Sequence, residues 1–251
     1  MAHAFSGSGP GGQTSDGCSV DLYRQMPYMG ELSDIEPELL KHTAALELGC
    51  GTGRLCGRLQ ELGIRVAGVD ESHEMLALLP AGVEPIESSI ETLDLGRRWP
   101  AVLLPSHLIN HPEESVRRSF VECARRHVEP NGTFFVKRHS TEWLSTVEEG
   151  RIGDSHGVSC FADLVSRAGD LVTMVFRYEA FGQSGHNRLP PARSILTKSR
   201  ISCRVADLAA LGGLARSNSG SLPPRVMPDH AGSSGACRPS GPHFVMAETP
   251  S

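Results

Sequence analysis

The stretch LELGCGTGRL at residues 46–55 combines residue types that bring bare main chain against a ligand. Its glycines stand at 49, 51 and 53, directly after an apolar run that is typical of a strand. A dinucleotide-binding loop reads Gly-x-Gly-x-x-Gly, and here Arg54 occupies the position of its third glycine. A Walker loop is excluded because no Gly-Lys-Ser/Thr follows. Glycines after a strand also form plain turns, so the neighbouring acids decide which ligand is expected.

Two carboxylates accompany this loop. Glu47 lies two residues before the first glycine, where a carboxylate suits an ammonium group and repels a phosphate. Asp70 ends the next apolar run, IRVAGVD, and would face the same crevice if the two strands are neighbours. A carboxylate accepts two hydrogen bonds, which matches the vicinal hydroxyls of a ribose. The pattern predicts a ligand with a ribose and an amine, a description that S-adenosylmethionine fits.

The chain resembles the class I S-adenosylmethionine-dependent methyltransferases of the small-molecule type. The resemblance rests on LELGCGTGRL, VAGVDESHEML and PAVLLPSHLINH, which occur in the family's order and spacing, and it covers residues 20 to 140 best. It implies S-adenosyl-L-methionine as the cofactor, bound by Glu47, Gly49, Gly51, Gly53, Asp70, Met75, Ser89, Ile90 and Leu104. Two departures are evident. Ser89 stands where the family usually has an Asp for the adenine amine, and Pro100 stands where it usually has an acid.

Methyl transfer from a sulfonium is an in-line displacement, so alignment and exclusion of water matter most. A base is needed only if the acceptor must lose a proton. Ligands of open α/β sheets bind beyond the carboxyl ends of the strands, where SHLINH and KRHS fall. We expect His107, and second His139, as base or orienting group, with Asn110, Tyr23 and Tyr28 binding the acceptor.

Each of these side chains also has a purely structural interpretation. A histidine at a strand end is more often a loop hydrogen-bonder, and such tyrosines are more often half-buried anchors. His107 and His111 have the spacing of a zinc pair, but Pro112 argues against a continuous helix, and no third ligand is obvious. No metal is therefore expected.

Strand and helix patterns alternate from residue 44 to residue 138, which predicts an α/β fold. We expect an open parallel Rossmann-like sheet with helices on both faces. VSCFADLVS and LVTMVFRYEAF, joined by RAGD, predict an added antiparallel hairpin layer. The expected domains are a disordered 1–17, a cofactor-binding core 18–140, a hairpin or lid 141–182, and an atypical, largely disordered tail 183–251. The tail has the composition of a GC-rich gene read out of frame, in which case the sheet would lack its last strands.

Composition excludes several classes of function. The net charge is -5, no apolar run is long enough to span a bilayer, and the seven cysteines are irregularly spaced. These features predict a cytoplasmic protein that binds neither membrane nor nucleic acid. They give no indication of an oligomeric state. Arg117, Arg118, Arg125 and Arg126 recur on one predicted helix, where a solvated outer face is the expected interpretation.

The expected function is transfer of a methyl group to oxygen or nitrogen of a small molecule. Two alternatives stay open at this point. One is an NAD(P)-dependent oxidoreductase, which Arg54 and Glu47 disfavour. The other is a non-catalytic binding module that keeps the cofactor fold.

Overall fold

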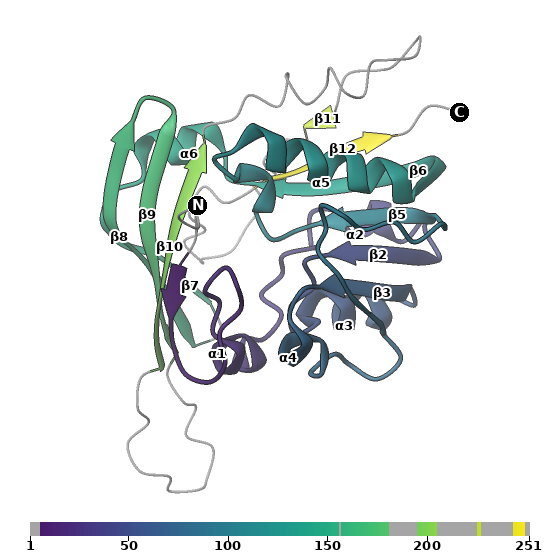
Figure 1. Ribbon diagram of the computed structural model, residues 1–251, viewed down its shortest axis with the longest axis horizontal. Helices are drawn as coiled ribbons and strands as arrows, with labels where there is room; N and C mark the ends of the chain where they lie inside the picture. The colour runs from purple at the N-terminus through teal and green to yellow at the C-terminus, as the bar shows by residue number, and fades with distance from the viewer. Residues whose placement is uncertain (1–5, 156, 181–194, 205–224, 227–242, 249–251) are drawn as a thin grey trace, which may run out of the picture.

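The chain forms two sheets that stand side by side (Figure 1). The computed structural model describes residues 6–155, 157–180, 195–204, 225–226 and 243–248. A seven-stranded sheet carries helices, and a five-stranded antiparallel sheet lies beside it. The α/β fold class and the antiparallel layer are therefore confirmed.

The larger sheet has the order β11-β12-β6-β5-β2-β3-β4. Its strands are β2 (Ala44–Leu48), β3 (Arg65–Asp70), β4 (Glu84–Glu87), β5 (Trp99–Leu104), β6 (Val128–Arg138), β11 (Arg225–Val226) and β12 (His243–Glu248). The five strands from β4 to β6 are parallel, whereas β12 runs antiparallel to β6. In this order β2 lies between β3 and β5, and the chain crosses from β4 at the edge back to β5 on the other side of β2, so the strand order reverses beside β2. Open α/β sheets bind ligands at such a point.

Helices cover both faces of this sheet because its central strands are apolar on both sides. On one face lie α2 (Glu36–Leu39) and α3 (Arg54–Glu61), whose Leu39 and Leu59 are fully buried. On the other face α5 (Glu114–His127) buries Phe120 and Ala124, as the spacing of its apolar residues predicts.

The smaller sheet has the order β1-β10-β9-β8-β7. Its strands are β1 (Ser6–Ser8), β7 (Gly150–Ser155), β8 (Val158–Ala168), β9 (Leu171–Ala180) and β10 (Ile195–Arg204). The expected hairpin is β8 and β9, which pair from Val158 with Ala180 to Ala168 with Leu171. Gly169 takes a positive φ of 61° in the tight turn, a conformation that glycine adopts without strain. The short helix α6 (Thr141–Thr146) packs Leu144 against this sheet.

The two ends of the chain differ from the sequence expectation where the structure describes them. Residues 6–17, expected to be disordered, contain β1, and Gln13 forms a bridge with Ser19. The tail contains β10, which joins the smaller sheet. It also contains β11 and β12, which form an antiparallel pair at the edge of the larger sheet. The rest of the tail lies outside the described residues. The domain boundaries themselves stay a prediction.

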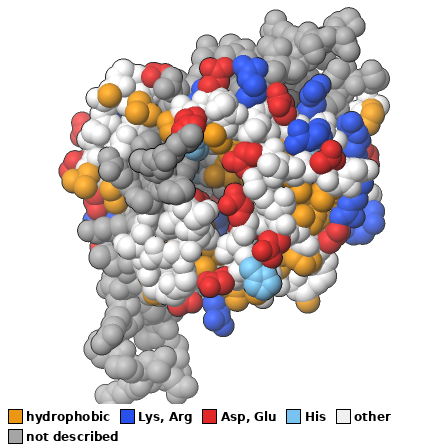
Figure 2. All heavy atoms as spheres, in the orientation of Figure 1, with side chains coloured by type: hydrophobic (Ala, Val, Ile, Leu, Met, Phe, Trp, Pro, Cys, Tyr) orange, Lys and Arg blue, Asp and Glu red, His pale blue; other side chains and the backbone are white. Residues whose placement is uncertain are grey.

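Two further local details correct the sequence interpretation. Pro100 lies inside β5, which begins at Trp99, and the register with β6 shifts between Trp99 and Ala101. Arg117 was expected on a solvated face but is buried, because its Nη1 donates to the carbonyls of His111 and Pro112. On the face shown in Figure 2, the basic side chains over α5 alternate with acidic ones rather than forming one patch. In the described part of the chain, no helix has the length and apolarity needed to cross a membrane.

Candidate functional site

The glycine loop connects β2 to α3 at the carboxyl end of the sheet. Gly49, Gly51 and Gly53 all take positive φ, at 72°, 55° and 79°, so side chains there would be strained. A Cβ on Gly49 would lie 2.9 Å from Leu108 Cδ1, and one on Gly53 only 2.4 Å from Leu79 Cδ2. A Cβ on Gly51 would meet nothing within 4 Å. The loop is therefore packed at both ends and open at its middle, where main chain is available to a ligand.

Asp70 closes β3 beside this opening. Its Oδ2 accepts from the Gly51 amide at 2.8 Å, and its Oδ1 accepts from the Ser72 amide at 2.9 Å. Burial raises the pKa of Asp70, while these two hydrogen bonds lower it. The side chain remains partly exposed. Each oxygen still has a lone pair, so the carboxylate can bind vicinal hydroxyls while it holds the loop.

Glu47 lies beneath the loop rather than in the opening. It is 1% exposed, and its Oε2 accepts from the thiol of Cys56 on α3 at 2.9 Å. Burial raises the pKa of Glu47 to about 8; the Cys56 hydrogen bond lowers it, and the charge of Asp70 raises it further. Glu47 is therefore largely protonated at neutral pH, and this neutral form is less suited to the expected pairing with a ligand ammonium.

The three apolar residues expected to bind the cofactor are all buried. Met75 lies on α4 (His73–Leu76), and Ile90 and Leu104 pack in the core on the α5 side of the sheet. The Ser89 hydroxyl donates to Glu91 Oε2 at 2.5 Å. Its lone pairs leave it able to accept from an amine. Ser106 donates to the Gly49 carbonyl at 3.1 Å, which ties the loop after β5 to the glycine loop.

His107 and His139 come together although they follow different strands. Their ring centroids are 4.1 Å apart and the planes differ by 3°. His107 takes a left-handed φ of 58° at the start of the turn η1 (Leu108–Asn110), and His139 directly follows β6. Asn110 accepts from the His139 amide at 2.9 Å through its Oδ1, so it positions this segment. His111 accepts from the Glu113 amide, which fits the hydrogen-bonding role considered for it.

One ring nitrogen of each histidine has no hydrogen-bond partner among the described residues. Nδ1 of His107 and Nε2 of His139 are buried, and no described residue bonds to either. Burial, followed by the charges of His139 and Lys137, holds the pKa of His107 well below its usual value. Burial lowers the pKa of His139 to about 4, with a further effect of Lys137. Both rings are therefore neutral at pH 7, and each unpartnered nitrogen can form a hydrogen bond with water or with a ligand.

An aromatic stack continues from this pair into the smaller sheet. Trp143 on α6 lies 4.8 Å from the His139 ring, and Phe176 on β9 lies 6.4 Å from Trp143. Sequence reasoning missed both residues, because the contact joins segments that no local pattern connects. A signal existed for Trp143, which is one of only two tryptophans and comes three residues after the predicted KRHS strand end.

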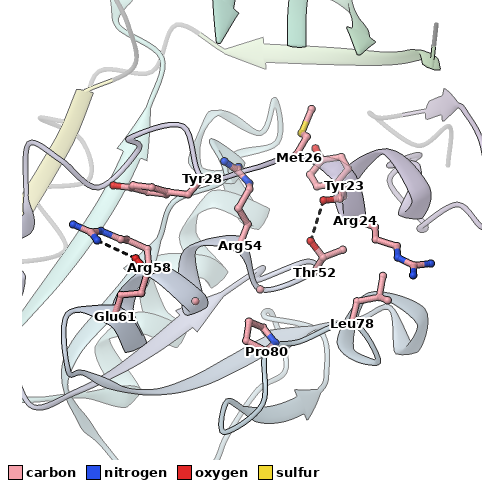
Figure 3. A pocket seen from close by; sticks show the side chains of 12 residues that line it. Tyr23, Arg24, Met26, Tyr28, Thr52, Arg54, Arg58, Glu61, Leu78 and Pro80 are labelled. Carbon is pink, nitrogen blue, oxygen red and sulfur yellow. Dashed lines mark hydrogen bonds and ion pairs between the residues drawn. The ribbon is translucent and has the colours of Figure 1, made fainter. Parts of the chain in front are cut away.

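Tyr23 and Tyr28 line a cavity beside the glycine loop (Figure 3). Tyr23 lies on α1 (Val20–Gln25), whose carbonyl at Tyr23 accepts from the Thr52 hydroxyl at 3.2 Å. The Tyr23 hydroxyl accepts from Cys18 at 3.5 Å, and the Tyr28 hydroxyl donates to Glu36 at 3.3 Å. Both tyrosines are thus anchored on the cavity wall. Among the described residues, no three potential ligands are placed to hold a metal ion.

Comparison with known proteins identifies the segment that carries this geometry. Residues 45–132 match the family described as "Methyltransferase domain". A putative methyltransferase of Geobacillus sp. (strain WCH70) is 36% identical over 75 residues, which are 28% of this chain and 30% of that protein. The matched segment, residues 45–132, is therefore a methyltransferase domain.

Solved structures share the fold of this methyltransferase domain and of its neighbouring sheet. CalS10, an amino pentose methyltransferase from Micromonospora echinaspora solved with S-adenosylmethionine bound, aligns with a TM-score of 0.65 at 18% identity. That alignment covers 91% of this chain and 95% of CalS10. The sugar N-methyltransferase KedS8 from Streptoalloteichus sp. ATCC 53650 aligns with a TM-score of 0.64 at 17% identity, over 97% and 99% of the two chains.

The methyltransferase domain match contains only part of the candidate site. Glu47, the glycine loop, Asp70 and His107 lie inside residues 45–132. The tyrosines, His139 and Trp143 lie outside it, in the segments that flank the domain. The candidate acceptor residues are therefore divided between the matched segment and the chain that flanks it.

Proposed function

We propose that the chain transfers a methyl group from S-adenosylmethionine to nitrogen or oxygen of a small-molecule acceptor. The observation that carries this proposal is the pair of unpartnered imidazole nitrogens on His107 and His139. They lie at the carboxyl ends of β5 and β6, at the edge of the sheet where the glycine loop also lies. A small acceptor donating an N–H or O–H would satisfy nitrogens that are otherwise buried without a partner.

The cofactor side of the site fits an aminoacyl nucleoside. Asp70 would hold the ribose, the open main chain around Gly51 would lie against the ligand, and Met75 and Ile90 with Leu104 would supply apolar surface. Ser89 would accept from the adenine amine. The bound cofactor supplies an activated methyl group on a sulfonium. A neutral Glu47 and backbone carbonyls are compatible with that charge, and the site contains no phosphate-binding lysine of the Walker type.

The acceptor side favours an uncharged nucleophile. Lys137, 7% exposed, and the two histidines surround the acceptor position with neutral or positive groups. Such surroundings disfavour an ammonium and favour the free amine, which is the form that attacks carbon. Because the pKa of His139 is about 4, this ring orients an N–H or O–H rather than holding its proton. His107, shifted in the same direction, has the same role.

We favour nitrogen on a polar ring, such as an amino sugar. The free-amine argument supports nitrogen, and Trp143 presents an aromatic face beside His139 against which a ring can pack. CalS10 and KedS8 act on an amino pentose and a sugar nitrogen by their names, which supports the same class here.

The test is methyl transfer from labelled S-adenosylmethionine to matched panels of amino sugars, phenols and carboxylates. We expect product with the amines. His139→Phe keeps the stack but removes the nitrogen, and should lower kcat by about 100-fold with cofactor Kd unchanged. His73→Gln is the control, because His73 is exposed and bonds only to Glu87. Cofactor binding without transfer to any panel would favour the non-catalytic alternative, and binding of NAD instead would favour the oxidoreductase.

A further inference from the structure

Lys137 is a buried lysine on the acceptor side of the candidate site. It lies on β6 two residues before His139, the spacing that places two side chains on one side of an extended chain. Each of these two residues is only 7% exposed. Lysine is among the residues least often buried, so its place beside the acceptor histidines calls for a chemical explanation.

The chain uses arginine for almost all of its other cations. Of its 24 basic residues only three are lysines, at positions 41, 137 and 198. An arginine does not give up its proton in proteins, whereas a lysine that is taken out of water can do so. A lysine rather than an arginine at buried position 137 therefore makes proton transfer chemically possible there.

Charged and titratable groups from four segments lie around Lys137. Arg54 at the start of α3 lowers the pKa of Lys137 by its charge, and the exposed Asp34 before α2 raises it. The charge of Lys137 in turn lowers the pKa of His107, in the loop after β5, and of His139. The two imidazole rings stack on each other with their centroids 4.1 Å apart. The ammonium group therefore lies within electrostatic reach of both acceptor histidines.

Lys137 is better matched to a basic role than the other titratable groups of the site. Burial, followed by the charge of Arg54, lowers its pKa to about 8, so part of it is a free amine near neutral pH. His139, with a pKa of about 4, is too weak a base to take a proton from an ammonium. Glu47 lies beneath the glycine loop and is bonded to Cys56.

We propose that Lys137 is the base that takes the proton of the acceptor ammonium. The inference rests on the proposed function. An aliphatic amine such as an amino sugar is mostly an ammonium at pH 7, and its nitrogen cannot attack carbon until one proton leaves. In this step an N–H bond of the acceptor breaks, its electron pair stays on the acceptor nitrogen, and a new N–H bond forms on Nζ of Lys137. The freed lone pair is the one that accepts the methyl group, and Lys137 returns its proton to solvent before the next turnover.

The kinetic test uses two acceptors that differ in charge at pH 7. An amino sugar is mostly an ammonium, whereas an aromatic amine is neutral and has no proton to lose before attack. Lys137→Met should lower kcat for the amino sugar by about 100-fold and change kcat for the aromatic amine by less than about threefold. Lys137→Arg keeps a cation that cannot accept a proton, and should behave like Lys137→Met. Lys41→Met is the matched control, because Lys41 is exposed and pairs with Glu38.

A second test measures the ionisation of Lys137 without any turnover. Because the chain has only three lysines, carbon-13 NMR of protein labelled at lysine Cε can follow each one, with Lys137→Arg assigning the signal. That signal should titrate with a pKa of about 8. Asp34→Asn should move the titration to lower pH, because the charge of Asp34 favours the ammonium form. The rise of kcat with pH for the amino sugar should move by the same amount, and Asp94→Asn, at an exposed turn, should move neither.

The outcomes separate this inference from the proposed function. An equal loss of kcat for both acceptors in Lys137→Met would overturn the inference, because the lysine would then act only on the structure. A titration that shifts in Asp34→Asn while the kcat profile stays in place would also overturn it, and this exposed variant tests the idea even if Lys137→Met does not fold. If the unaltered protein methylates neither amine, the proposed transfer to nitrogen fails as well. If it methylates both and the Lys137 variants match it, only this inference fails.

Discussion

The thiol of Cys56 donates a hydrogen bond of 2.9 Å to Glu47 Oε2 in the interior beneath the glycine loop. Both side chains are buried, and the Cys56 thiol also interacts with Cys50 of the loop. This contact joins β2 to the helix that follows the loop. It therefore links the two elements that the glycine loop connects.

Cys56→Ala should destabilise the protein more at pH 9 than at pH 6. The pKa of Glu47 is about 8, raised from 4.5, so the folded state binds a proton that the unfolded chain releases above about pH 4.5. Stability from this group is present at low pH and falls as the pH rises through 8. Removing the thiol donor raises the pKa further and deepens that fall. Thermal unfolding at the two pH values measures it, with Cys56→Ser, which keeps a donor, as control. An equal loss at both pH values would contradict the coupling.

Gly51→Ala should weaken cofactor binding by at least tenfold with little effect on stability. The new Cβ meets no protein atom within 4 Å but occupies the open middle of the loop, at a cost of roughly 1 kcal/mol for the positive φ. Gly63→Ala is a matched control, because Gly63 also has positive φ and open surroundings. Calorimetry with S-adenosylhomocysteine and thermal unfolding of both variants separate the two effects. A similar Kd for the two variants would refute a ligand at Gly51.

Asp70→Asn should raise the cofactor Kd by about 10- to 100-fold, since a charged acceptor for ribose hydroxyls becomes a neutral amide. The amide oxygen can still accept from one of the two backbone donors, so the fold should persist. Asp94→Asn is the control, because Asp94 accepts only from the Gly96 amide at an exposed turn. Titration of both variants with adenosine as well as the full cofactor would show whether the loss lies at the ribose. An adenosine affinity that does not change would argue against that role.

Acid should destabilise the protein between about pH 6.5 and pH 4. In this window the unfolded chain protonates its histidines, whereas the folded chain keeps His139 neutral until about pH 4. The shift corresponds to about 3 kcal/mol at the acidic end of the window. His139→Phe should flatten this part of the profile, measured by urea unfolding at a series of pH values. A variant whose acid sensitivity equals that of the parent would show that other groups dominate.

Trp143→Leu should raise the acceptor KM while leaving the cofactor Kd unchanged. Its ring stacks 4.8 Å from His139 on the acceptor side and makes no contact with the glycine loop among those described. Phe161→Leu is the control, because Phe161 lies in the same antiparallel sheet but packs under Arg177. Steady-state kinetics with the best acceptor amine would measure the acceptor KM, and calorimetric titration would measure the cofactor Kd. A parallel change in both variants would indicate general loosening of the sheet.

The residues proposed to bind the cofactor come together through local sequence. Gly49, Gly51 and Asp70 are specified by a strand, a loop and the next strand, all within one short stretch whose periodicity is clear. The residues proposed to bind the acceptor do not come together through local sequence. The stack of His107, His139 and Trp143 depends on how strand ends and a helix from distant segments meet, which periodicity does not encode. The position of Glu47 was also unpredictable, since only the packing of α3 shows its carboxylate facing Cys56.

Arg54 and Arg117 illustrate the same limit. The sequence marks Arg54 only as a break in a dinucleotide motif, and nothing local predicts the cavity around it. Arg117 falls on the polar stripe of its helix, yet the backbone carbonyls of the preceding turn accept its guanidinium. In both cases the environment of the arginine is formed by residues outside its own helix.

The pairing of β12 with β6 has a consequence for synthesis of the chain. Residues 139–242 separate the two strands, so β6 leaves the ribosome long before its antiparallel neighbour. Until residues 243–248 emerge, the nascent domain presents an unpaired strand edge, which is the feature that promotes intermolecular association. Premature termination in that interval would yield a product that keeps the parallel strands β2 to β6 and loses β12, the strand that pairs with the edge of β6.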